Sequence, residues 1–190
     1  MTILNSTAAL IIVDVQEGFD DPVWGERNNP QAETNIERLL DVWRRTGRPI
    51  FHVKHDSPNP HSPLHPSSPG NAIKALVRPL DDEPLLRKSV NSAFIGTDLE
   101  QRLHDVGVKT VILTGMTTNH CVETTARMAA NLGFETYFVY DATATFDRTG
   151  PDGRRYSADE VGAMTLVNLQ GEFATIVTTD SILEHVSARP

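Results

Sequence analysis

The sequence predicts a single three-layer α/β/α domain with a Rossmann-like, mostly parallel six-stranded sheet. Stretches typical of buried strands alternate with amphipathic helical stretches along the whole chain, which is the pattern of parallel strands joined by crossover helices. The chain has 190 residues, enough for one domain with its own hydrophobic core. We therefore expect residues 1–190 to form one domain. No GxGxxG motif or P-loop is present, so this architecture comes without a nucleotide-binding signature.

Each predicted strand is a short apolar run rich in branched residues and bounded by polar or turn residues. These runs are Ala8–Val13, Pro49–Lys54, Leu85–Val90, Val111–Leu113, Thr136–Tyr140 and Phe173–Thr179. After the fourth run, Gly115 is expected to form a tight turn.

The predicted helices are recognised by apolar residues at helical spacing and by their end signals. The first helix, residues 35–46, ends at Gly47 and buries one face made of Ile36, Leu39, Leu40 and Trp43. Thr97 is expected to cap the second helix, which buries Leu99, Leu103 and Val106.

Three further helices follow in the second half of the chain. One begins among Thr117, Thr118 and Asn119 and ends at Gly133. Ser157 and Glu160 predict a capping box for the next, which carries Val161, Met164 and Val167. Asp180 is expected to cap a short terminal helix.

Composition argues against several classes of function. The net charge of −8 and the pI near 5.3 are unfavourable for a general binder of nucleic acid or of anionic membranes. The apolar run Ala8–Val13 is six residues long, far below the roughly 20 needed to span a bilayer. The single cysteine excludes an intramolecular disulfide and fits a reducing compartment. We expect a cytoplasmic protein without a nucleic-acid or membrane partner.

Asp14, Lys88 and Cys121 each lie at or just beyond the end of a predicted strand. Because the carboxyl ends of parallel strands meet at one edge of the sheet, we expect the three side chains to come together. A carboxylate can take the thiol proton, an ammonium can hold both groups in place, and the sulfur can attack an electrophilic carbon. The alternatives are a capping role for Asp14 and a packing role for Cys121.

The position of Cys121 also suggests how its thiol is tuned. It lies in the first turn of the predicted helix, where backbone N–H groups favour an anion. We therefore expect a lowered thiol pKa.

The motifs AALIIVDVQ, RKSVNSAF and GMTTNHCVETTAR occur in this order, and the chain resembles the isochorismatase-like cysteine hydrolases from about Thr7 to Leu183. Nicotinamidases and carbamoylsarcosine amidohydrolases belong to the same superfamily. The resemblance implies a catalytic triad of Asp14, Lys88 and Cys121. It also implies a cis peptide bond between Met116 and Thr117, an oxyanion hole formed by the N–H groups of Thr117 and Cys121, and a homo-oligomer, dimer or tetramer.

The resemblance implies acyl transfer through a thioester on Cys121, without a cofactor. Nicotinamidases hold a metal through an Asp-x-His pair after the second strand, and the residues His55–Pro58 break that pairing. Isochorismatases proper tend to lack the nucleophilic cysteine, so its presence favours cleavage of a carbon–nitrogen bond. Hydrolysis of an isochorismate-type vinyl ether and a catalytically silent binding protein are the alternatives.

Two long loops, residues 55–84 and 141–156, are expected to shape the substrate pocket. The first holds seven of the twelve prolines, which stiffen it. Its candidate metal ligands fit no strong ligand signature, so we expect no metal and keep a bound metal as the lesser alternative; these ligands are His55, Asp56, His61 and His65. The candidate substrate-binding residues are Phe19, Trp24, His55, Asn91, Phe94 and Phe146. The alternatives are packing over the sheet edge for Phe19 and Trp24, and anchoring of the loop after Lys88 for Phe94. Asn119 lies near the same edge, and His120 is expected to serve in packing or in a subunit contact.

Overall fold

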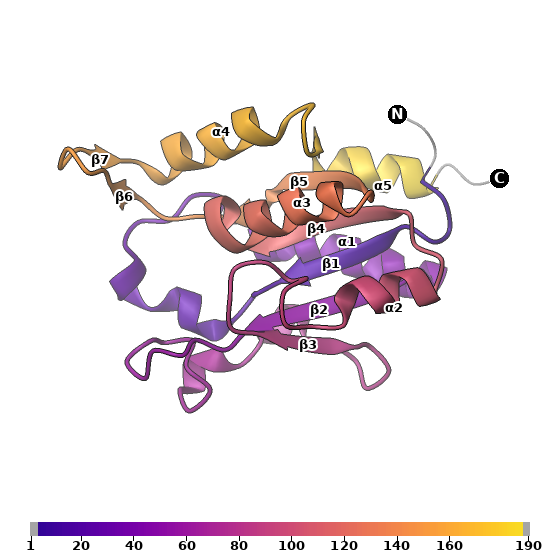
Figure 1. Cartoon of the computed structure of the whole chain (residues 1–190), viewed down its shortest axis with the longest axis horizontal. Coiled ribbons are helices and arrows are strands. Elements are labelled where there is room, and N and C mark those ends of the chain that lie inside the picture. Colours follow the sequence, from indigo (N-terminus) through magenta and orange to yellow (C-terminus); the bar gives the residue numbers. More distant parts are fainter. Residues whose placement is uncertain (1–3, 188–190) are drawn as a thin grey trace.

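The computed structural model describes residues 4–187. Its centre is a six-stranded sheet in the order β3-β2-β1-β4-β5-β8, and each neighbouring pair is parallel (Figure 1). The strands of this sheet are β1 (Ala9–Val13), β2 (Ile50–His55), β3 (Leu85–Lys88), β4 (Thr110–Met116), β5 (Glu135–Ala144) and β8 (Thr175–Val177). The predicted fold class is therefore confirmed.

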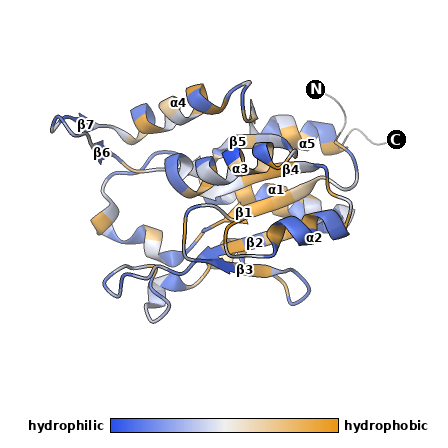
Figure 2. Cartoon of the chain, viewed as in Figure 1, coloured by the Kyte–Doolittle hydropathy of each residue, from blue (hydrophilic) through white to orange (hydrophobic). Residues whose placement is uncertain are grey.

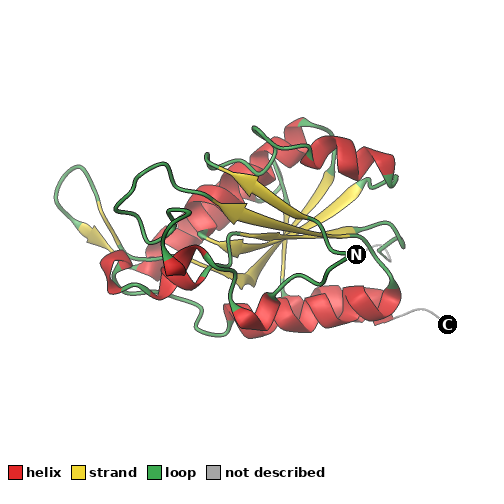
Figure 3. Cartoon of the chain, turned by 90° about the horizontal axis from the view of Figure 1, so that it is seen from below, coloured by secondary structure: helices red, strands yellow, loops and turns green. Residues whose placement is uncertain are grey.

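Helices cover both faces of the sheet (Figure 3). They are α1 (Ala32–Thr46), α2 (Leu99–Asp105), α3 (Glu123–Asn131), α4 (Ala158–Leu169) and α5 (Thr179–Ser187). Short helical turns are η1 (Glu17–Asp20), η2 (Pro22–Trp24), η3 (Pro69–Asn71), η4 (Ala75–Val77) and the π-helical turn η5 (Thr118–Val122). A two-stranded antiparallel hairpin that was not predicted, β6 (Arg148–Thr149) with β7 (Arg155–Tyr156), extends from the body.

Side chains that alternate along β1 pack into two separate cores, one on each face of the sheet. Leu10 and Ile12 belong to the core that includes residues of α1 and α5. Ile11 and Val13 belong to the core that includes residues of α2 and α3. The central strands are accordingly the most hydrophobic part of the chain (Figure 2). The buried face predicted for the first helix is confirmed, and Trp43 donates a hydrogen bond from Nε1 to the Ala8 carbonyl at 2.9 Å.

Gly115 lies inside β4 and not in a turn, which corrects the prediction. Its φ is +119°, and a Cβ added there would lie 2.0 Å from the Val13 carbonyl oxygen. The pairing of β4 with β5 shifts register between Leu113 and Gly115. A glycine is therefore required because β1 and β4 approach each other closely and because the backbone is left-handed.

Other differences lie at helix ends. Val106 follows the last residue of α2 and is 50% exposed, so it does not share the buried face. Asp98, and not Thr97, is the N-cap residue of α2. Asp180 lies within the first turn of α5, which begins at Thr179. The capping box of Ser157 and Glu160 is confirmed at the start of α4.

The helix α4 carries apolar side chains on its outer surface. Met164 is 58% exposed and Val167 is 70% exposed, although both follow the predicted helical spacing. In Figure 1, α4 lies at the margin of the molecule, next to the β6–β7 hairpin. Within residues 4–187, no helix combines the length and the apolar character needed to cross a bilayer.

Candidate active site

Asp14 directly follows β1 and is fully buried. Its backbone has a φ of +54°, a left-handed conformation that is uncommon outside glycine but more frequent in aspartate than in most other residues. Its N–H donates to the Val53 carbonyl of β2 at 2.9 Å. The carboxylate oxygen Oδ1 is buried and makes no hydrogen bond with any of the residues that the structure describes, so a lone pair is left for an incoming proton.

Lys88, the last residue of β3, has a fully buried side chain that connects three groups. Its Nζ lies 2.5 Å from Asp14 Oδ2, 3.1 Å from His55 Nδ1 and 3.3 Å from Cys121 Sγ. The parallel register of β2 and β3 places His55 beside Lys88. The structure thus brings the three residues predicted at the strand ends together, and it adds His55 as a fourth.

Cys121 lies in the π-helical turn η5 between β4 and α3. The peptide bond between Met116 and Thr117 is cis, and this is the bond that the resemblance singles out. The Thr117 carbonyl accepts from the N–H groups of His120 at 3.1 Å and Val122 at 3.2 Å. These two bonds use neither of the N–H groups expected in the oxyanion hole, those of Thr117 and Cys121.

Burial sets the protonation of the site. It raises the pKa of the Cys121 thiol to about 12, and the Asp14 carboxylate contributes to this rise. The direction is opposite to that expected from the helix N-terminus, because removal of the thiolate from water outweighs the local backbone field. Burial also raises the pKa of Asp14, against the opposing effect of the Lys88 ammonium. The thiol therefore keeps its proton at neutral pH, and Asp14 is a stronger base than an exposed aspartate.

His55 is held in place through its backbone by two buried residues that the sequence analysis did not single out. The side chain of Gln16 accepts from the His55 N–H at 2.8 Å and donates to the His55 carbonyl at 3.0 Å. Asn71 donates to the same carbonyl at 3.1 Å. In the sequence, the feature that could have pointed to Gln16 is its place two positions after Asp14, because it is an uncharged polar residue next to a predicted site carboxylate.

The residues that could bind a metal are already engaged. In the described part of the chain, one group of possible ligands converges, with atoms of Asp14, His55 and Cys121 within 4.8 Å of one another. The Lys88 ammonium is bonded to all three and occupies the position between them. A positive charge at this place disfavours a second cation.

The candidate metal ligands of the loop following β2 do not converge. Asp56 pairs with Arg87 at 2.6 Å. His65 bonds Ser67 at 2.7 Å, and His61 is exposed. Apart from His55, these side chains therefore form no ligand cluster within residues 4–187.

Three of the predicted pocket residues form an aromatic cluster. The ring centroids of Phe19 and Trp24 are 5.2 Å apart, and Phe146 lies 6.2 Å from Phe19 and 6.0 Å from Trp24. Met116, which precedes the cis bond, is buried in the same hydrophobic cluster. Leu64 of the proline-rich loop also belongs to it. The cluster thus joins loops that are distant in the sequence.

Two other predicted pocket residues, Phe94 and Asn91, do not belong to this aromatic cluster. Phe94 stacks on Phe134 with ring centroids 6.0 Å apart and packs against a core cluster, so it anchors the loop after β3. Asn91 is exposed and makes no hydrogen bond within the described residues. Asn119 accepts a hydrogen bond from Thr145 at 2.5 Å. His120 is exposed and lies 3.5 Å from Arg148.

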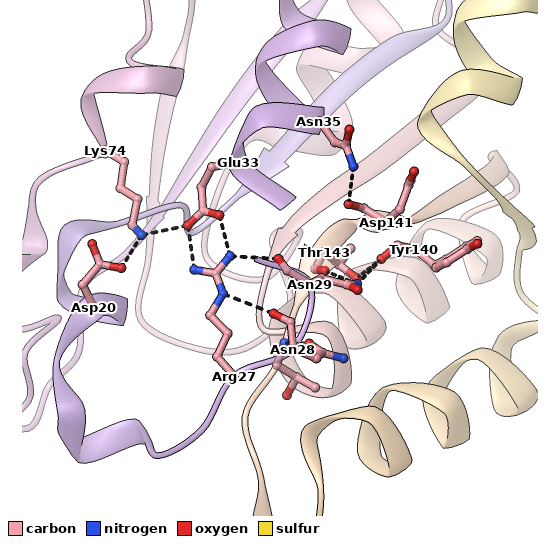
Figure 4. Close-up of polar contacts among 11 residues, drawn as sticks. Asp20, Arg27, Asn28, Asn29, Glu33, Asn35, Lys74, Tyr140, Asp141 and Thr143 are labelled. Atoms are coloured by element: carbon pink, nitrogen blue, oxygen red, sulfur yellow. Dashed lines mark hydrogen bonds and ion pairs between the residues drawn. The ribbon is translucent and has the colours of Figure 1, made fainter. Parts of the chain in front are cut away.

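Glu33 of α1 links the loop after β1 to the loop after β2, near the carboxyl ends of these strands (Figure 4). It pairs with Arg27 from the loop after β1 and, at 2.8 Å, with Lys74 from the loop after β2. Lys74 also pairs with Asp20 at 2.5 Å. Next to this network, Asn29 donates to the carbonyls of Tyr140 and Thr143 in β5, at 2.9 Å and 2.8 Å. The network fixes segments that carry the aromatic cluster.

Glu33→Gln is expected to destabilise the protein at pH 7, and to do so progressively less as the pH falls from 4.5 toward 2. The hydrogen bonds from Arg27 and Lys74 lower the pKa of Glu33 to about 2, against the opposing effect of burial. The stability contributed by a carboxyl with a depressed pKa is present above its ordinary value of 4.5 and is lost as the pH falls toward about 2. Urea unfolding at pH 7, 4 and 2.5 measures this, with Glu37→Gln on the same helix as the control. A destabilisation that is equal at all three pH values would show that the charge is not responsible.

Comparison with known proteins points to one family. The model of the isochorismatase domain family matches residues 8–181. The isochorismatase family protein YrdC of Bacillus subtilis (strain 168) is 50% identical over 180 residues, which cover 95% of this chain and 96% of that protein. Nicotinamidase 3 of Arabidopsis thaliana is 32% identical over 191 residues, covering 94% of this chain and 88% of that protein. Among solved structures, a protein of the isochorismatase family from Chromobacterium violaceum has a TM-score of 0.96 and 42% identity, covering 100% of this chain and 98% of that one.

Proposed function

Because the chain belongs to the isochorismatase family of hydrolases, we propose that it is a cysteine hydrolase cleaving a carbon–nitrogen bond of a small amide, lactam or ureide. The observation that carries the proposal is the position of the Lys88 ammonium, within hydrogen-bond distance of both the Asp14 carboxylate and the Cys121 thiol. A packing role for Cys121 requires neither charged partner. The similarity to a protein named nicotinamidase supports an amide-like substrate.

The proposed reaction begins with transfer of the thiol proton to Asp14. The raised pKa of Asp14 makes it a suitable acceptor, and its unpaired Oδ1 can take the proton. Cys121 Sγ then attacks the carbonyl carbon, and the oxyanion is stabilised by the N–H groups of Thr117 and Cys121. Lys88 keeps the carboxylate and the sulfur in register throughout.

The tetrahedral intermediate collapses when Asp14 gives its proton to the leaving nitrogen. This breaks the carbon–nitrogen bond and leaves a thioester on Cys121. Asp14, again ionised, then removes a proton from a water molecule that attacks the thioester carbonyl. Release of the carboxylic acid restores the Cys121 thiol. No metal takes part, since Lys88 supplies the positive charge beside the sulfur.

The aromatic cluster of Phe19, Trp24 and Phe146 is the proposed apolar wall of the pocket. It suits a substrate with a flat or apolar portion next to its carbonyl. The exposed Met164 and Val167 of α4 support the further proposal that the chain assembles with copies of itself.

The test is a substrate panel of small amides, lactams, ureides and isochorismate, incubated with wild type and with Cys121→Ala, with products identified by mass spectrometry. We expect hydrolysis of a carbon–nitrogen bond by wild type and a loss of at least about 10³-fold in Cys121→Ala. A chelator is expected to leave the rate unchanged. Cleavage of isochorismate by Cys121→Ala would instead favour ether hydrolysis and a packing role for the thiol.

A further inference from the structure

His55 contacts the Lys88 ammonium and does not merely line the pocket. An ammonium has three N–H donors and no acceptor, so His55 Nδ1, 3.1 Å from Nζ, must accept. The imidazole proton therefore lies on Nε2. The other two N–H groups have acceptors in Asp14 Oδ2 and Cys121 Sγ. Three donors thus meet three acceptors, and His55 supplies the third.

The backbone of His55, at the end of β2, is held by hydrogen bonds with two buried side chains. Its backbone N–H and carbonyl are both bound by the fully buried Gln16. Asn71, which is 3% exposed, binds the same carbonyl. Three hydrogen bonds with two buried side chains fix the backbone of His55, and thereby the position from which its ring reaches Lys88. A substrate contact alone would not require this arrangement.

The charge state of His55 suits an acceptor. Burial and the neighbouring Lys88 charge lower its pKa to about 4, so the ring is neutral at physiological pH and Nδ1 keeps its lone pair. A carboxylate at this place would compete with Asp14 for the ammonium. A neutral acceptor holds the third N–H without drawing the charge away from Asp14 and Cys121.

We propose that His55 is a positioning residue that, by accepting the third hydrogen bond of Lys88, keeps Nζ between the Asp14 carboxylate and the Cys121 sulfur. Without it, Nζ is free to move toward Asp14 and away from Sγ, and the thiol loses the nearby charge that favours its thiolate. The inference deepens the proposed function and rests on it for the effect on turnover. Its effect on the thiol itself needs no substrate.

The first test compares His55→Asn with His55→Leu, which have similar shapes and differ in the presence of an acceptor near the place of Nδ1. The measurement is the rate of alkylation by iodoacetamide of Cys121, the only cysteine in the chain, with melting temperatures to verify folding. We expect about a tenfold slower reaction in His55→Leu, equivalent to about one unit in thiol pKa, and a rate within about twofold of wild type in His55→Asn. Equal rates in the two variants would overturn the proposal.

The second test asks whether His55 acts through Lys88. In a Lys88→Met background, where the side chain has no ammonium to hold, His55→Leu is expected to change the alkylation rate by less than about twofold. In this double-mutant cycle, the coupling between the two substitutions then nearly equals the effect of His55→Leu on the alkylation rate in wild type. Additive effects would contradict a role through Lys88 and would assign His55 to packing.

Measurements of kcat and KM distinguish a positioning role for His55 from a role in binding the substrate. With a substrate from the panel, His55→Leu is expected to lower kcat with KM nearly unchanged, and His55→Asn to retain most of kcat. A higher KM at unchanged kcat would instead mean that His55 binds the substrate. If the panel yields no substrate, the alkylation rates still decide whether His55 positions Lys88.

Discussion

Asp14→Asn is expected to lower kcat by about 10³–10⁴-fold while the protein stays folded. Asparagine keeps the shape of aspartate but cannot take the proton from Cys121, whose thiol pKa of about 12 leaves almost no thiolate at neutral pH. Loss of a general base typically lowers the rate by about 10²–10⁴-fold, and the high thiol pKa places this site in the upper part of that range. The measurement is kcat and KM for a substrate from the panel, together with the circular dichroism spectrum and the free energy of unfolding.

The effect of Asp14→Asn on the free energy of unfolding follows from the direction of the Asp14 pKa shift. A group whose pKa is raised by folding, as burial raises that of Asp14, stabilises the folded state below its ordinary pKa and loses that contribution as the pH rises through the folded value. At pH 7, asparagine therefore avoids the cost of a buried carboxylate, although Lys88 loses its countercharge. We expect the free energy of unfolding to fall, but by less than the roughly 3–5 kcal/mol typical of a broken buried ion pair, because the amide oxygen of asparagine still accepts a hydrogen bond from Lys88. A strong loss of stability with retained activity in the folded fraction would indicate a structural role for the three residues.

Gly115→Ala is expected to destabilise the protein by about 3 kcal/mol or more, or to prevent it from accumulating as soluble protein. The added Cβ would lie 2.0 Å from the Val13 carbonyl oxygen, and both atoms belong to paired central strands. Neither strand can move without loss of its hydrogen bonds, and a shift of Val13 would also displace Asp14. Urea unfolding measures the loss.

Gly107→Ala is the matched control for this prediction. Gly107 also has a positive φ, of +68°, but nothing lies within 4 Å of its added Cβ. Gly107→Ala is expected to lower the free energy of unfolding by about 1–2 kcal/mol, because only the strain of a left-handed backbone at a residue with a Cβ contributes. A loss in Gly115→Ala no greater than that in Gly107→Ala would show that the contact with β1 relaxes easily.

The fold and the three catalytic candidates were predictable because they depend on local patterns. Parallel strands bring their carboxyl ends to one edge whatever the loops do, so Asp14, Lys88 and Cys121 could be grouped before their distances were known. The roles of Gln16 and Glu33 were not predictable, because each depends on partners brought together by loop conformations that no periodicity encodes. For the same reason the sequence left open whether Phe94 lines the pocket or anchors the loop after Lys88, and the structure shows the anchoring role.

The rise of the Cys121 thiol pKa could not be predicted from the sequence either. A helix N-terminus can be recognised from a few consecutive residues, and it favours the thiolate. Desolvation depends on everything packed around Cys121, and in the folded protein it is the largest influence. The same limit applies to Gly115, whose need for a glycine arises from β1, about one hundred residues earlier in the chain.

The four groups of the site lie at or beyond the ends of four adjacent strands, in the order β3, β2, β1 and β4. Lys88 is supplied by β3, an edge strand of four residues that is paired with β2 alone. Detachment of β3 removes the ammonium from the site while the rest of the sheet is still intact. Catalysis in the proposed reaction therefore depends on the attachment of one short edge strand, even though that strand supplies a single side chain to the site.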